Sequence, residues 1–136
     1  MANLSQTAAN VKAGSAATRT QLVQAGESIT QGMPCYLWSD NKYYQCDAND
    51  TAVKAQAKGI ALTGAATDGY FLIAIDGLID LGATLAVGMV YVLSATKGAI
   101  CPYADLTTND YVTILGVATT TALLDIDINI SGVQKP

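Results

Sequence analysis

The sequence predicts an all-β domain, a small barrel or sandwich built from two tandem copies of one β-unit and preceded by an extended N-terminal arm. Short apolar runs recur at roughly 8–12-residue spacing between Gly, Asp and Asn positions, as in sandwiches and barrels. The motif G-x-[ST]-[IL]-x-x-G-M occurs at residues 26–33 and returns at residues 82–89. Two of the three methionines and two of the three cysteines share this repeated register. We therefore expect one β-unit at about residues 25–76 and its copy at about 81–130.

Within the first copy, turn chemistry separates the strands. Ser39-Asp40-Asn41-Lys42 predicts the turn of a hairpin, and Gly59 predicts a bulge or bend within a longer run. Asp76-Gly77 is expected to end the last strand of the copy. The expected strands lie at residues 20–24, 35–38, 43–46, 53–63 and 70–75.

The second copy repeats this order, and Cys46 is expected to superpose on Cys101. Its expected strands lie at residues 90–94, 99–101, 110–118 and 122–130. The last of them contains Asp125, Asp127 and Asn129, which period two places on one face. An EF-hand loop begins in this way but requires glycine at its sixth position and glutamate at its twelfth. Ile130 and Pro136 stand there instead, so we interpret the run as a half-exposed strand, and no metal site is predicted.

Residues 1–20 are interpreted as the N-terminal arm and residues 21–136 as a single β-domain. Residues 2–20 are rich in Ala, Ser, Thr and Asn and lack apolar periodicity; a helix over residues 5–12 has no apolar face. We expect the arm to lie extended over a partner surface, pairing with an exposed strand edge. Its deletion is expected to weaken partner binding and to leave the domain folded. The expected partner contacts are Val11, Leu22 and Val23 as apolar anchors, and Lys12 and Arg19 as cations that meet acidic groups.

Composition excludes several classes of function. Charged residues make up only 13% of the chain, about half the usual share, so much of the surface is expected to be covered by other subunits or a partner. A net charge of −4 with a single arginine argues against nucleic acid. No apolar run reaches the roughly 18–20 residues of a membrane span, and no signal peptide is recognised. Cys35, Cys46 and Cys101 are therefore expected as reduced thiols of a protein made in the cytoplasm.

No residue pattern predicts catalysis. The chain contains no histidine, which removes the commonest general base and the usual partner of a serine or cysteine nucleophile. We therefore expect a protein that is not an enzyme and takes no cofactor. The aromatic hairpin of Tyr36, Trp38, Tyr43 and Tyr44 is expected to fill the core or a subunit interface, with a ligand platform as the alternative.

Four stretches of the chain, residues 24–37, 59–66, 82–94 and 110–118, form a recognisable pattern. They resemble the capsid decoration proteins of tailed bacteriophages, also called cement or head-fibre proteins. The resemblance extends over about residues 20–133 and implies a virion structural protein without enzymatic activity. Such a protein binds the outer surface of the assembled head and stabilises it, with the major capsid protein as partner, after assembly in the host cytoplasm. It implies a homo-oligomer, for which a trimer is favoured. The resemblance supplies no contact residues.

A second structural function stays open at this point. The same β-unit suits a module of a phage tail fibre or baseplate that recognises a glycan on the host surface. Exposed rings at Trp38, Tyr43 and Tyr44 would favour this alternative, because aromatic rings stack on sugars.

Overall fold

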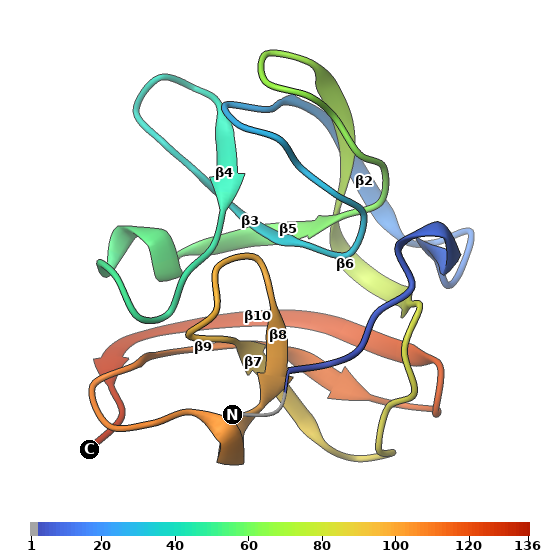
Figure 1. The fold of residues 1–136 in the computed structure, drawn as a ribbon. Helices are drawn as coiled ribbons and strands as arrows, with labels where there is room; N and C mark the ends of the chain where they lie inside the picture. The colour runs from blue at the N-terminus through green and yellow to red at the C-terminus, as the bar shows by residue number, and fades with distance from the viewer. Residues whose placement is uncertain (1–2) are drawn as a thin grey trace.

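The computed structural model describes residues 3–136 as an all-β fold whose sheet curls into a half-barrel (Figure 1). Across these residues, ten strands join in one sheet. Eight of them follow the order β4-β3-β5-β6-β10-β9-β7-β8, and β1 and β2 pair with β6 beside this path. The all-β expectation is confirmed.

Two series of strands follow the N-terminal segment along the chain. Short 3-10 helices lie at η1 (Ala8–Asn10), η2 (Val53–Ala55) and η3 (Tyr103–Asp105). The strands are β1 (Val11–Ala13), β2 (Arg19–Gln24), β3 (Pro34–Leu37), β4 (Tyr43–Gln45), β5 (Ala57–Ala61), β6 (Tyr70–Leu81), β7 (Val90–Leu93), β8 (Ile100–Pro102), β9 (Tyr111–Ala118) and β10 (Leu123–Gln134).

Strand β6 connects the two halves of the molecule. Its first part pairs with β2 and β5, and its last part pairs with β1 and β10. The expectation that the strand ends at Asp76-Gly77 is wrong, since β6 continues to Leu81. Gly77 has a φ of 97°, a backbone conformation that glycine adopts without the steric cost of a Cβ. The glycine therefore changes the course of the strand without ending it.

The two copies of the sequence motif form the same turn. The second glycine of the motif has a positive φ in each copy, 89° at Gly32 and 81° at Gly88. Its N–H donates to a carbonyl late in the β-run that follows, from Gly32 to Ala61 and from Gly88 to Ala118, both at 2.8 Å. These contacts join the entry of β3 to β5 and the entry of β7 to β9.

The strand pairing in the two hairpins does not follow the alignment of identical residues in the two copies. Cys46 donates its N–H to the carbonyl of Pro34, the first residue after the first motif, at 2.9 Å. Cys101 lies opposite Val92, the third residue after the second motif. The expected superposition of Cys46 on Cys101 is therefore wrong. The hairpin connections differ in length, so identity of residues and pairing register diverge beyond the turn.

Two further expectations concern the run at residues 53–63. Its first part is the 3-10 helix η2, so the expectation of a strand from Val53 is wrong. The irregularity expected at Gly59 is present, because the pairing of β3 with β5 shifts between Cys35 and Tyr36 and leaves Lys58 as an additional residue.

Alternation of inward and outward side chains builds part of the core, and it is clearest where β2 pairs with β6. Val23 of β2 lies opposite Phe71 of β6, and both side chains point inward, whereas their neighbours Leu22 and Leu72 point outward. The larger cluster of buried residues contains side chains of both halves, so the halves share one core. Its members include Tyr36, Ile60, Ile79, Val92, Leu115 and Leu124.

The N-terminal segment packs on its own chain. Leu4 donates its N–H to the carbonyl of Ile100 at 2.8 Å, and the Gln6 side-chain amide donates to the carbonyl of Leu81 at 3.2 Å. Val11 is only 3% exposed and lies in the larger core cluster, and β1 pairs with the end of β6. The expectation that Val11 anchors an extended arm on a partner is thus wrong, because Val11 is buried in the core of its own chain and β1 pairs with β6. Residues 1–2 of the expected arm lie outside the described residues.

Two glycine substitutions distinguish the cost of a steric clash from the cost of an unfavourable backbone conformation. A Cβ on Gly116 would lie 2.0 Å from the carbonyl oxygen of Asp125, whereas a Cβ on Gly88 would meet no atom within 4 Å. We expect Gly88→Ala to lower the free energy of unfolding by about 1–2 kcal/mol through its positive φ. Gly116→Ala should cost about 3 kcal/mol or more, because the backbone of β10 must move. Urea denaturation measures both, and equal losses would contradict the close approach of β9 to β10.

Candidate functional site

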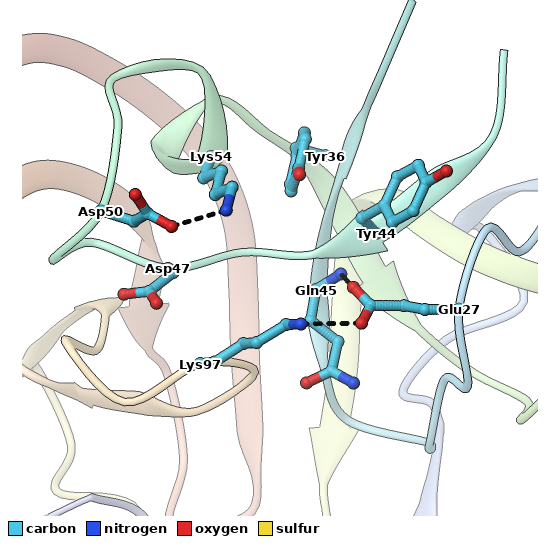
Figure 2. A pocket seen from close by; sticks show the side chains of 8 residues that line it. All are labelled: Glu27, Tyr36, Tyr44, Gln45, Asp47, Asp50, Lys54 and Lys97. Atoms are coloured by element: carbon cyan, nitrogen blue, oxygen red, sulfur yellow. Dashed lines mark hydrogen bonds and ion pairs between the residues drawn. The ribbon is translucent and has the colours of Figure 1, made fainter. Parts of the chain in front are cut away.

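A hollow of about 440 Å³ lies where the β3–β4 hairpin meets the turn between β7 and β8 (Figure 2). A second hollow of about 290 Å³ shares Tyr36, Tyr44 and Lys54 with it and adds Trp38 and Thr51. We call the two hollows together the aromatic groove. The residues that line the first hollow are Glu27, Tyr36, Tyr44, Gln45, Asp47, Asp50, Lys54 and Lys97.

Period two along the hairpin decides which aromatic rings reach this groove. Tyr36 lies directly opposite Tyr44, and the two rings stack with their centroids 5.9 Å apart. Trp38, which directly follows the end of β3, meets Tyr36 edge to face at 6.4 Å and remains 46% exposed. Tyr43 has the opposite orientation, is buried, and packs edge to face on Phe71. The aromatic hairpin therefore divides into a core ring at Tyr43 and a ring cluster at the groove.

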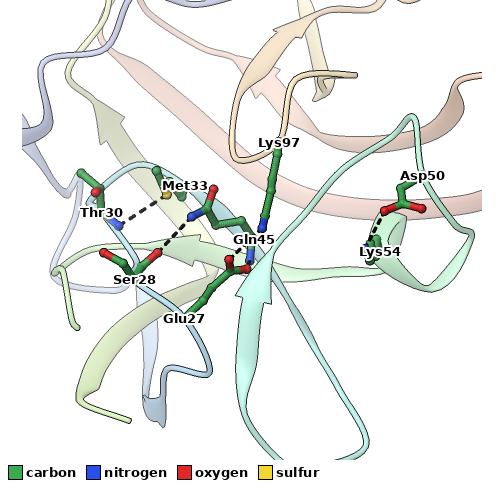
Figure 3. Close-up of polar contacts among 8 residues, drawn as sticks. All are labelled: Glu27, Ser28, Thr30, Met33, Gln45, Asp50, Lys54 and Lys97. Atoms are coloured by element: carbon green, nitrogen blue, oxygen red, sulfur yellow. Dashed lines mark hydrogen bonds and ion pairs between the residues drawn. The ribbon is translucent and has the colours of Figure 1, made fainter. Parts of the chain in front are cut away.

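Ion pairs fix the polar side of the groove (Figure 3). Glu27 accepts a hydrogen bond from the N–H of Gln45 at 2.9 Å and pairs with Lys97 at 2.8 Å. This ion pair joins the first half of the chain to the second. Lys54 pairs with Asp50 at 2.5 Å. With Asp47, the lining has three carboxylates and two lysines, a net charge of −1.

The tyrosines of the groove are neutral phenols near pH 7. Desolvation by burial raises the pKa of Tyr36, and nearby Lys54 acts in the opposite direction. The Tyr44 hydroxyl donates a hydrogen bond of 2.5 Å to the Asp40 carboxylate. This bond and, to a smaller extent, desolvation raise the pKa of Tyr44 to about 12. Neither phenol is activated as a base or nucleophile, so their chemistry here is stacking and hydrogen bonding.

The three cysteines are buried free thiols, as the sequence predicts. Burial raises the pKa of each thiol, with a smaller contribution from Glu27 at Cys35. The pKa of Cys101 reaches about 11. A reactive cysteine requires a lowered pKa and access to solvent, so these thiols act as core side chains.

The five predicted partner contacts do not form one surface. Val11 and Val23 are buried in separate clusters of the core, where they anchor β1 and β2 to the chain itself. Lys12, Arg19 and Leu22 are exposed. Of the apolar anchors, only Leu22 is placed to meet a partner.

Leu22 belongs to an apolar surface that the sequence analysis did not recognise. It lies opposite Leu72 on β6, two residues from Tyr70, and Leu22 and Tyr70 are each 64% exposed. A hollow of about 340 Å³ lies between β2 and the β3–β4 hairpin, where Leu37 joins Leu22 and Tyr70. We call Leu22, Leu37, Tyr70 and Leu72 the apolar strip. The outward face of a half-buried strand is normally polar, so these side chains are exposed against the expected pattern.

The remaining patterns have a structural explanation. Asp125 and Asp127 are exposed on β10 and alternate with Ile126, which is buried, as expected for a half-exposed strand. Within residues 3–136, no three Asp, Glu or Cys side chains are grouped so that they could hold a metal ion. The same residues contain no helix that is long and apolar enough to cross a membrane.

Sequence reasoning missed the charged residues of the groove. Glu27 lies inside the repeated motif and Lys97 in the turn of the other hairpin, and nothing in their spacing links them. Only the fold brings them together. No protein-family model matches this chain, and no curated protein matches it in sequence.

The buried thiols predict how stability depends on pH. Unfolding returns the Cys101 thiol to water and to its ordinary pKa of 9.0, below its folded pKa of about 11. The contribution of Cys101 to the free energy of unfolding is therefore fully present below pH 9. It is lost as the pH rises from 9 toward 11. Urea denaturation at a series of pH values should show this fall.

The variant Cys101→Ala is the control for this pH dependence. Its smaller side chain costs stability at every pH, but its decline above pH 9 should be shallower than that of the unaltered chain. Parallel declines in the two proteins would show that Cys101 does not contribute.

Proposed function

We propose that this chain is a non-enzymatic structural protein of a bacteriophage particle that binds the outer surface of the assembled head and stabilises it. The resemblance of residues 20–133 to capsid decoration proteins motivates the proposal. Only 13% of the residues are charged, which supports the proposal, because a surface with few charges is typically covered by another protein. The major capsid protein is the proposed partner.

The apolar strip is the observation that carries this proposal furthest. Exposed leucine and tyrosine side chains on neighbouring strands are typical of a protein interaction surface. The strip lies beside an edge of the sheet: within residues 3–136, β2 pairs along its length with β6 alone, apart from a single bridge between Ala25 and Tyr43. A strand of the partner can pair with this free edge while the strip packs against apolar side chains.

The proposal includes a homo-oligomer, with a trimer favoured. It also includes duplication of one β-unit at about residues 25–76 and 81–130. The shared turn at Gly32 and Gly88, with hydrogen bonds of the same length to the last residues of β5 and β9, supports this duplication. An experimental structure in which residues 26–63 and 82–120 have unrelated strand orders would contradict it.

The second candidate function is a tail-fibre or baseplate module that recognises a host glycan. One observation favours it, the half-exposed Trp38 ring in the aromatic groove. Tyr43, which was expected to join this ring, is buried and lies outside the aromatic groove.

A charge placed in the apolar strip tests the contact with the head. Leu22→Asp should keep the fold, because Leu22 is 64% exposed, and should weaken binding to purified particles at least about tenfold. Co-sedimentation of the protein with particles that lack it measures this binding.

Val87→Asp is the matched control, since Val87 is also 64% exposed but lies in the turn before β7. We expect it to bind particles like the unaltered chain. Unchanged binding by Leu22→Asp would contradict the assignment of the strip. A chain that fails to bind the heads at all would contradict the proposed function.

A further inference from the structure

We infer that the aromatic groove is a binding site for a neutral saccharide. The inference concerns the ligand of this groove and goes beyond attachment to the head. It would apply equally to a chain on the head or on the tail. It is argued from ring geometry, polar groups and charge.

The apolar part of the groove offers a rigid aromatic surface. Tyr36 is 5% exposed and stacks on Tyr44, so it cannot rotate freely. Trp38 meets the Tyr36 ring edge to face and keeps nearly half of its surface open. One face of a pyranose ring consists of C–H groups, which pack on an exposed ring with little loss of conformational freedom.

The polar part supplies hydrogen-bonding groups of both kinds next to these rings. The Gln45 amide, the Glu27 carboxylate and the Lys97 ammonium line the same hollow. The backbone and ion-pair contacts of Glu27 hold its carboxylate in place, and the Gln45 side chain donates to the carbonyl of Ser28 at 2.9 Å. A set of fixed donors and acceptors beside an apolar face is what recognition of sugar hydroxyls requires.

Charge decides between classes of small ligand. Both lysines of the groove are already paired with carboxylates, which leaves no free cation for a phosphate or sulfate group. The volumes of about 440 and 290 Å³ are of the order of known small-molecule sites, roughly 300–1,000 Å³. An uncharged polyhydroxyl ligand satisfies all of these conditions.

Trp38 provides a direct readout, because it is the only tryptophan of the chain. We would titrate the full-length protein with maltotriose, mannotriose and chitotriose, and with heparin-derived oligosaccharide and polyphosphate as charged probes. The expected result is a saturable change in tryptophan fluorescence with at least one neutral trisaccharide below about 10 mM. No response to the neutral probes, or a response to the charged probes alone, would overturn the inference.

Variants assign any binding to the groove, with calorimetry as the readout because Trp38→Ala removes the fluorophore. Trp38→Ala and Glu27→Gln should each weaken binding of the responding trisaccharide at least about tenfold. Tyr103→Ala is the matched control, since Tyr103 is 43% exposed and lies outside the groove. Equal binding by all three variants would overturn the inference. Glu27→Gln preserves side-chain size and keeps the test decisive if Trp38→Ala fails to fold.

A cell-binding experiment distinguishes two possible sources of the saccharide. Purified host cell envelopes that retain the protein, with release by the responding trisaccharide, would indicate a surface glycan; binding of the free trisaccharide alone would indicate a soluble ligand. Particle co-sedimentation of Trp38→Ala distinguishes this inference from the proposed function. That variant should still bind heads, because its change lies outside the apolar strip.

Discussion

The fold depends on one long strand that serves both halves of the sheet. Each half would otherwise leave strand edges and apolar faces uncovered, and β6 pairs with four strands along its two edges. Gly77 allows this continuity, with a φ of 97° in the middle of the strand. A Cβ at this position would also lie 2.9 Å from the Cα of Thr18, so the N-terminal segment packs on the bend.

The aromatic groove is a consequence of this junction. One wall comes from the hairpin of the first half and another from the β7–β8 turn, with the ion pair between Glu27 and Lys97 across the boundary. A second contact joins the halves, in which the Thr113 hydroxyl donates to the carbonyl of Ala55 at 2.5 Å. The geometry of the groove therefore depends on how the halves dock, and local changes in one half should reach it.

Period-two patterns and turn residues carried enough information to predict the fold class and most strand positions. They failed where one residue type is compatible with two structures. Gly77, for example, could either end a strand or redirect it. They also failed at Val11, because a single apolar residue in a polar segment shows no periodicity although it is buried. The groove was only half predictable: the rings of Tyr36 and Trp38 belong to one hairpin, whereas Lys97 reaches Glu27 through tertiary structure alone.

Electron cryomicroscopy of intact particles from cells that express this chain would locate the protein directly. We expect density for the β-fold on the outer surface of the head, with Leu22 and Tyr70 facing the capsid lattice and Trp38 directed away from it. Density for the chain on the tail, or particles without the chain, would contradict the claim that it decorates the head.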